Sequence, residues 1–268
     1  MLKYATLRFH YYLKYCQYCL ILSTNLQKKL KYQSELGKLL SHQIDKIIAN
    51  ISIDCVIFGF ESGVLEVLLI KRAIEPSKSE WALPGGFILK NEELNSAAER
   101  ILNETSGVEN IFMEQLSAFG DINRYPERRV ITIGYYALVS PDKYVLSPGI
   151  DTSEVKWFQL SNINKLPFDH NLIIDEALKK LREKVRYHPI GFELLPKKFT
   201  LPKLQSLYES ILGVKLDKRN FRKKLSKMNL LIKLDEKEKD NLRRAAYLYK
   251  FDKKSYKKLI DNGFSFQL

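Results

Sequence analysis

Alternating hydrophobic and polar positions become regular after about residue 50. Ile53–Phe60 and Val64–Lys71 are rich in β-branched and aromatic residues and flank the turn Glu61-Ser62-Gly63, so they predict a β-hairpin. Three further strands are predicted at Ile111–Phe119, Val130–Val139 and Val155–Phe158. Strands mixed with one central helix predict an α+β sandwich.

Two helices accompany these strands. Ser96–Leu102 has apolar residues at helical spacing, and four of them are expected to face the core: Ala97, Ala98, Ile101 and Leu102. A second helix is predicted from its N-cap, Asp169, to about Val185. Its expected inner face is Leu172, Ile173, Ala177, Leu181 and Val185. His170 and His188 have no obvious partner in the sequence and are expected to be ordinary surface or core histidines.

The last 70 residues have a different pattern, which predicts a helix-turn-helix followed by a hairpin. Thr200 is the expected N-cap of a helix with Pro202 in its first turn, ending at Gly213. Asp217 is the expected cap of a second helix, Lys218–Met228. The expected inward residues of the two helices are Leu204, Leu207, Tyr208, Ile211, Phe221, Leu225 and Met228. Leu230–Leu234 and Ala245–Phe251 complete a hairpin with Arg243 and Arg244 near its tip. This order commonly places a helix in the DNA major groove; the alternative is a basic helical hairpin that binds protein.

The chain length, the N-terminal residues and the cysteines suggest the domain bounds and the cellular compartment but no chemistry. The 268 residues allow two domains, and we expect an N-terminal extension of unknown role at 1–48, a first domain at 49–188 and a second at 189–268. Lysine and arginine interrupt the apolar residues of the extension, so neither a signal peptide nor a transmembrane helix is expected. Cys16, Cys19 and Cys55 are too few for a disulfide framework or a zinc site. We expect a cytoplasmic protein with no membrane partner.

The net charge of +13 is concentrated in one part of the chain. Residues 197–258 contain 20 Lys and Arg against 7 Asp and Glu, whereas the remainder contains 24 of each. A neutral domain therefore carries a strongly basic one, which favours a polyanion partner, most often nucleic acid. The alternative is a lysine-rich surface that is merely solvated.

The stretch Gly86–Val108 has the spacing G-x5-E-x7-R of the Nudix box, which it resembles. Gly86, Glu92, Arg100, Leu102, Glu104, Gly107 and Val108 match that pattern. Ile101 and Thr105 stand where the pattern has glutamates. Positions 101, 104 and 105 share one side of a helix, and Mg²⁺ prefers carboxylate oxygens, so Glu104 alone predicts weak metal binding. We expect no catalytic residues, no metal site and no cofactor. The alternative is that this stretch is simply a surface helix.

From about Ile51 to Leu259 the chain resembles Nudix-related transcriptional regulators. The resemblance is carried by Trp81–Phe87, the box, Phe168–Leu178, Tyr187–Gly213, Leu216–Lys224 and Tyr247–Asp252. It implies a Nudix-type α/β/α sandwich followed by a winged helix-turn-helix. It also implies a homodimer that binds double-stranded operator DNA and responds to a small molecule, either an ADP-ribose-type nucleotide or a pentose such as arabinose. The family's Arg-Asp-Pro-Arg-Gly-Arg loop is replaced here by Arg124-Tyr125-Pro126-Glu127-Arg128-Arg129, which leaves the effector open.

Candidate residues follow from the resemblance and from the chemistry of DNA readout. The effector is expected near the box, at Arg72, Trp81, Gly85, Gly86, Glu92, Arg100, Glu104 and Asp121. DNA is expected at Lys218, Arg219, Asn220, Arg222, Lys223, Lys224, Lys227, Arg243 and Arg244. Two hypotheses remain: a regulator without hydrolase activity, or a Nudix hydrolase of a nucleoside diphosphate derivative such as ADP-ribose with a basic appendage.

Overall fold

The structure, a computed structural model, describes residues 47–61, 63–188, 194–238 and 245–261. Contacts group Ile48–Leu268 into one unit, separate from Met1–Ile47. The N-terminal extension, with Cys16 and Cys19, therefore lies almost wholly outside the described residues. In the described part, no helix is both long and apolar enough to cross a membrane.

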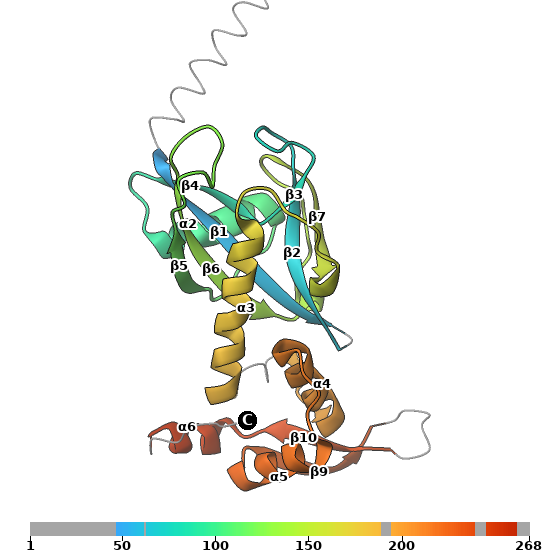
Figure 1. Cartoon of the computed structure of the whole chain (residues 1–268). Helices are drawn as coiled ribbons and strands as arrows, with labels where there is room; N and C mark the ends of the chain where they lie inside the picture. The colour runs from blue at the N-terminus through green and yellow to red at the C-terminus, as the bar shows by residue number, and fades with distance from the viewer. Residues whose placement is uncertain (1–46, 62, 189–193, 239–244, 262–268) are drawn as a thin grey trace, which may run out of the picture. The chain divides into compact units, whose positions relative to one another are not determined.

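A seven-stranded sheet forms the first part of this unit (Figure 1). Its strands are β1 (Ile47–Glu61), β2 (Val64–Arg72), β3 (Trp81–Ala82), β4 (Gly85–Leu89), β5 (Glu114–Phe119), β6 (Ile131–Val139) and β7 (Thr152–Gln159). The order is β3-β2-β1-β6-β5, with β4 paired to β1 and β7 paired to β2. β1 runs antiparallel to β2 and parallel to β6. The predicted β1–β2 hairpin is confirmed, and the strand predicted from Ile111 begins only at Glu114.

Both faces of the sheet are covered, because successive residues of β1 enter different cores. Cys55 and Ile57 pack with residues of α2 (Leu94–Ser106), whereas Val56 and Phe58 pack with residues of α3 (His170–Tyr187). These alternate side chains point to opposite faces of a strand, so the two helices lie on opposite sides of the sheet (Figure 1). The short 3-10 turns η1 (Pro141–Lys143) and η2 (Leu160–Asn162) flank β7.

Helix α2 is longer than the sequence pattern predicted. All four expected core residues, Ala97, Ala98, Ile101 and Leu102, are buried. The helix continues for four residues past Leu102, because Thr105 and Ser106 are also buried, with their hydroxyls bonded to carbonyls one turn back. Gly107 ends it at a positive φ of 73°, where a left-handed residue closes the last turn.

Helix α3 differs from its prediction in two places. Asp169 is the N-cap residue, but its side chain makes no capping hydrogen bond, because Arg124 holds both carboxylate oxygens. Leu172, predicted to be buried, is 57% exposed. Ile174 and Leu178 are buried with Ile173 and Leu181. The inner face therefore follows i, i+3, i+4 steps from Ile173, and Leu172 falls outside it.

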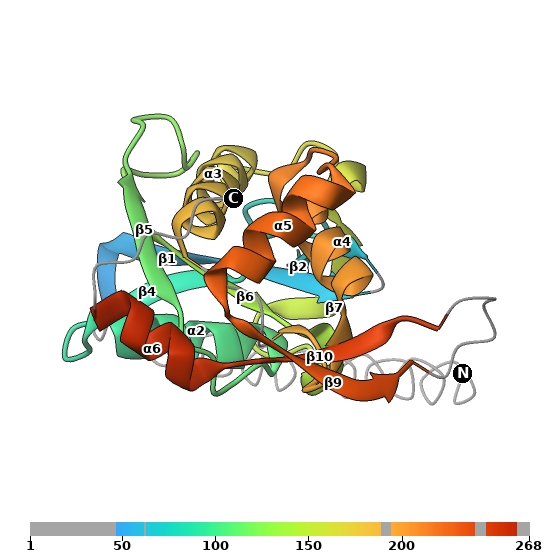
Figure 2. The same cartoon turned by 90° about the horizontal axis from the view of Figure 1, so that it is seen from below.

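The last part of the unit is a winged helix (Figure 2). Helices α4 (Leu201–Leu212) and α5 (Lys218–Met228) begin at the predicted caps, Thr200 and Asp217, whose side chains accept backbone N–H bonds. β9 (Leu231–Lys237) and β10 (Tyr247–Phe251) form the predicted hairpin. The sequence pattern missed β8 (Phe199–Thr200), a two-residue strand beside β10, and α6 (Lys253–Asp261). Of the predicted inward residues only Met228 is incompletely buried.

Candidate effector site and nucleic-acid interface

The outward side of the Nudix-type box is an ion-pair network centred on Arg100. Its Nε and Nη2 donate to the two oxygens of Glu92 at 2.6 and 2.8 Å, and its Nη1 donates to Glu104 Oε2 at 2.8 Å. A further Nη2 bond reaches the Phe87 carbonyl at 3.1 Å. Hydrogen bonding from Arg100 lowers the pKa of Glu92. Arg100 therefore fastens the start of α2 to the loop before it.

The inward side of the box is closed and apolar. Ile101 is 2% exposed, and a Cβ added to Gly86 would lie 3.3 Å from its side chain. Thr105 is buried and its hydroxyl donates to the Ile101 carbonyl at 2.7 Å. Of positions 101, 104 and 105, only Glu104 is exposed; Ile101, as expected, and Thr105 are buried in the core. Within the described residues, no group of three or more metal-binding side chains is found.

A buried polar cluster lies beside the glycine loop that precedes the box. Arg124 donates to both oxygens of Asp169, at 2.9 and 2.7 Å, and to Asp54 Oδ2 at 3.1 Å. His170 Nδ1 accepts the Leu83 N–H at 3.0 Å, so the proton of the neutral ring is on Nε2, 3.6 Å from Asp54 Oδ1. His170 is thus a core histidine with partners.

Electrostatics hold Asp54 ionised in this cluster. Burial alone would raise the pKa of its carboxyl, but His170 and Arg124 outweigh burial and lower that pKa. Gly85 is required here, because a Cβ at that position would lie 2.3 Å from Asp54 Oδ1. Thr132, on the neighbouring strand, is buried near Asp54 and also acts to lower the pKa of Asp54.

Sequence reasoning missed this cluster, although two signals were present. Asp54 is an acidic residue inside an otherwise apolar strand, and Asp169 was interpreted only as a helix cap. Arg124 was placed in a loop, and nothing local indicated that it is 7% exposed. Arg124 is 45 residues from Asp169 and 70 residues from Asp54 in the sequence. The spacing of residues within a helix or strand cannot predict contacts over such a distance.

The remaining predicted effector residues lie in several surroundings. Trp81 packs edge-on against Phe158, with 4.7 Å between ring centroids. Arg72 donates from Nε to the Pro76 carbonyl at 2.8 Å and lies over the ring of Phe168. Asp121 is exposed and accepts the Asn123 N–H within its own turn. The structure thus brings Glu92, Arg100 and Glu104 into contact and leaves Trp81 with a different set of neighbours.

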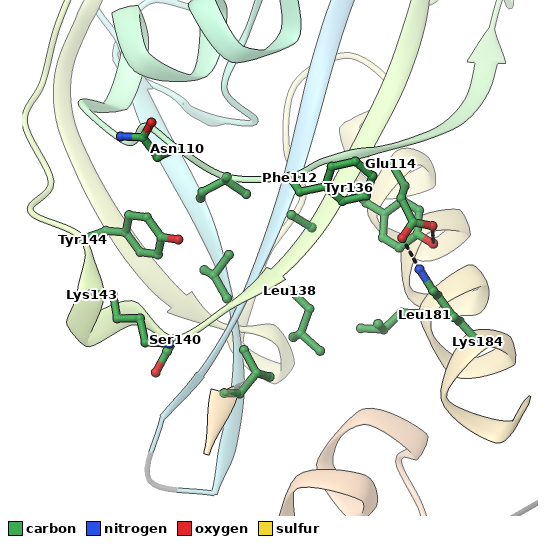
Figure 3. Close-up of a pocket in the computed structure, with 14 residues that line it drawn as sticks. Asn110, Phe112, Glu114, Tyr136, Leu138, Ser140, Lys143, Tyr144, Leu181 and Lys184 are labelled. Carbon is green, nitrogen blue, oxygen red and sulfur yellow. Dashed lines mark hydrogen bonds and ion pairs between the residues drawn. The ribbon is translucent and has the colours of Figure 1, made fainter. Parts of the chain in front are cut away.

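A cavity of about 430 Å³ opens elsewhere, between β6 and the second half of α3 (Figure 3). Leu138 and Leu181 line its apolar part, and Glu114 forms an ion pair with Lys184 at one side. Lys184 and the Tyr136 hydroxyl hold the two oxygens of Glu114, and this bonding keeps the pKa of Glu114 low despite burial. None of the predicted effector residues lines it. A smaller cavity of about 260 Å³ lies along α2 and includes Arg100.

Helix α5 presents a basic surface. Phe221 and Leu225 are buried, and all seven of its residues predicted to contact DNA are exposed: Lys218, Arg219, Asn220, Arg222, Lys223, Lys224 and Lys227. Six of these are cationic, and the helix contains no acidic residue. In the described part of the winged helix, no acid pairs with them, whereas Lys198, Lys203 and Lys215 each pair with a glutamate. Arg243 and Arg244 lie outside the described residues.

Helix α3 is in direct contact with the winged helix. Arg182 Nε donates to the Ile211 carbonyl in the last turn of α4 at 2.9 Å. Ser210 donates to the Gly63 carbonyl at the β1–β2 turn at 2.6 Å. Because α3 begins next to the Arg124–Asp169 pair, one helix connects the buried cluster to α4.

Comparisons with known proteins agree with this arrangement. A NUDIX domain model matches residues 49–181, and an NrtR DNA-binding winged helix domain model matches residues 191–251. The ADPR responsive transcriptional repressor NtrR of Acinetobacter baylyi is 34% identical over 234 residues, covering 85% of this chain and 92% of the relative. An ADP-ribose pyrophosphatase of Methanocaldococcus jannaschii is 34% identical over 121 residues, 44% of this chain and 70% of that enzyme.

Solved structures extend the likeness to both parts of the chain. The structure of Shewanella oneidensis NrtR complexed with a 27mer DNA has a TM-score of 0.64 and 30% identity, and the match covers 81% of this chain and 97% of that one. The match therefore spans the sheet and the winged helix together, whereas the pyrophosphatase matches less than half of the chain. The expected fold, a Nudix domain followed by a winged helix, is confirmed. The chain belongs to the family of Nudix-related transcriptional regulators.

Proposed function

We propose that this protein binds operator DNA through α5 and that an ADP-ribose-type nucleotide, bound in the Nudix domain, controls that binding. The observation that carries the DNA assignment is α5 itself, an exposed helix with six cations and no acid on a winged-helix scaffold. Arg219, Asn220 and Arg222 are the candidates for base edges, and the lysines for phosphates. Residues 49–188 act as the sensor and residues 189–268 as the DNA reader.

The effector assignment rests on the A. baylyi relative, which is named as ADPR-responsive and matches along nearly its whole length. The residues proposed to surround the nucleotide are those of the box and its glycine loop, with Arg72 and Asp121 beyond them. A pentose remains the second candidate. A homodimer is proposed from the family resemblance, since a two-fold reader suits a near-palindromic operator.

We assign no hydrolase activity. The inner face of α2 has Ile101 and Thr105 in the core, and Glu104, the exposed carboxylate of that set, is bonded to Arg100. The alternative, hydrolysis of ADP-ribose, is favoured by the M. jannaschii relative. Incubation with ADP-ribose and Mg²⁺ should release no AMP above background. Turnover that Glu104→Gln abolishes would establish the alternative.

Operator binding tests the regulator. Fluorescence anisotropy with the full chain and a labelled operator duplex should show tight binding that ADP-ribose reverses and arabinose does not. Reversal by arabinose alone would replace the nucleotide with a pentose. A chain in which Lys223, Lys224 and Lys227 are all changed to Gln should lose about three units of the slope of log K against log salt, because each lost phosphate contact removes roughly one.

The matched control changes three other lysines of the winged helix. Lys198, Lys203 and Lys215 are exposed but paired with Glu236, Glu238 and Glu209. Replacing these three lysines by Gln removes the same total charge. If the control lowered the salt slope as much as the α5 variant, binding would depend on net charge and α5 would not be the reading helix.

A further inference from the structure

Aromatic and guanidinium groups stack beside the buried cluster. The rings of Tyr125 and Phe168 lie 5.2 Å apart between centroids, with 19° between their planes. The guanidinium carbon of Arg72 lies 5.4 Å from the centroid of Phe168. We call Arg72, Phe168 and Tyr125 the Tyr125 platform. Among the described residues, Phe168 is the one ring in contact with Tyr125, so the second face of Tyr125 is not covered by another ring.

A second aromatic–guanidinium pair connects this platform with the box. Arg128 lies 4.7 Å from the ring centroid of Phe87, which follows Gly86 in β4 and whose carbonyl accepts from Arg100. Arg128 and Arg72 both lie near the Tyr125 hydroxyl: burial and Glu127 raise the pKa of that hydroxyl, and the two arginines act against this rise. Two cationic side chains therefore act on the Tyr125 hydroxyl, one stacked on Phe168 and the other on Phe87.

The backbone at the platform is strained. Phe168 has a φ of 58°, a left-handed conformation that bulky side chains rarely adopt. Such conformations persist where the surrounding structure imposes them, and they gather at ligand sites and switches. In this conformation the ring of Phe168 contacts both Tyr125 and Arg72.

We propose that the face of Tyr125 turned away from Phe168 is the subsite for the planar base of the nucleotide effector, with Arg128 directed at its phosphates. This inference rests on the proposed function and names the part of the effector that is read. A base stacks on an aromatic ring through its π-face, and guanidinium groups pair with phosphate oxygens. A free pentose has neither a planar ring nor a phosphate, so the platform selects a nucleotide over it.

The same residues flank the link to α3. Tyr125 follows Arg124, and Phe168 precedes Asp169, so the base would contact the neighbours of both partners in the buried salt bridge. Since Asp169 is the first residue before α3 and Arg182 in that helix bonds to α4, occupation of the subsite acts on the helix that contacts the winged helix.

Titration calorimetry on the full chain tests the subsite. Tyr125→Leu should weaken ADP-ribose binding about 10- to 100-fold, the loss expected for one stacked base, and should leave ribose 5-phosphate within about twofold of the wild type. Tyr125→Phe keeps the ring and should bind ADP-ribose within about twofold of the wild type. A decrease in the adenine absorbance band on binding to the unaltered chain reports the stack without any substitution.

Four results would overturn the proposal. If the wild type does not bind ADP-ribose, the effector assignment fails and the subsite fails with it. If the wild type binds and Tyr125→Leu binds as tightly, only the subsite is wrong. Equal losses for ADP-ribose and ribose 5-phosphate in Tyr125→Leu would show a disturbed loop instead of a lost stack. An unchanged adenine band on the wild type would also exclude stacking, even if Tyr125→Leu failed to fold.

Discussion

Restoring the missing glutamate of the box at position 101 should destabilise the protein. Ile101 is 2% exposed and packs among Ala97, Ala98 and the β1 side chains in the core under α2. Gly86 packs against Ile101, since a Cβ added to Gly86 would lie 3.3 Å from the Ile101 side chain. Ile101→Glu therefore places a carboxyl in an apolar, closed environment and not in an open cleft.

The size of the effect follows from two losses. Removing a fully buried isoleucine costs about 1.5–3 kcal/mol of transfer free energy. A buried polar group without a hydrogen-bond partner adds about 1–3 kcal/mol. We therefore expect Ile101→Glu to lose about 2.5–6 kcal/mol of unfolding free energy, a large share of the roughly 5–15 kcal/mol that a domain has.

The deficit should also depend on pH. Burial raises the pKa of the introduced carboxyl above about 4.3, its value in the unfolded chain. The folded state then holds the proton more tightly than the unfolded state. The deficit is smallest below about pH 4.3 and grows by about 1.4 kcal/mol per pH unit until pH passes the raised folded value.

Urea unfolding of wild type, Ile101→Glu and Ile101→Gln at pH 5 and pH 8 measures these terms. Ile101→Gln has a similar shape and does not titrate, so its deficit should be the same at both pH values. Ile101→Leu should cost less than about 1.5 kcal/mol. If Ile101→Glu were as stable as the wild type, or if Mg²⁺ restored its stability, position 101 would face an open metal site and the reasoning would be wrong.

Other expected outcomes concern the DNA surface and the buried cluster. Arg219→Ala should cost about 1–3 kcal/mol on the cognate operator and relax base preference, whereas Lys224→Ala should weaken all duplexes alike; anisotropy on matched and mutated operators separates the two. Arg124→Met should lose about 3–5 kcal/mol in urea unfolding, since it leaves the buried Asp54 and the partly buried Asp169 without their cation. Because the pKa of Asp54 is lowered in the folded state, its contribution is present above about pH 3.8 and is lost as pH falls through the folded value. Asp54→Asn should therefore show a smaller loss of stability below pH 4 than the wild type, measured by thermal unfolding across pH.

The spacing of apolar and capping residues in the sequence predicted those helices whose ends and faces depend on neighbouring residues. Both winged-helix caps follow from a Thr or Asp followed by a helical pattern, and the exposed side of α5 follows from Phe221 and Leu225 at i, i+4. Leu172 was misplaced because an apolar residue at the edge of a helical stripe has the same sequence signature as one inside it.

The buried cluster could not be predicted in the same way. Arg124 and Asp169 are 45 residues apart, and only the folded sheet brings their loops together. Charged residues in a loop ordinarily face solvent, so sequence reasoning gave Arg124 no special role. The position of Ile101 was predicted correctly, but its contact with the glycine loop depends on tertiary packing.

Because α3 is long, a small tilt at its N-terminal end would move its C-terminal end by a larger distance. An 18-residue helix is about 27 Å long, so it can act as a lever with the Arg124–Asp169 pair at one end. A tilt of about 5° at that end would carry the other end through roughly 2 Å, the scale of helix shifts that accompany switching. Stiffness is then a functional property of the helix. A flexible residue such as glycine in the exposed middle of α3 should blunt the response to effector while leaving both binding surfaces intact.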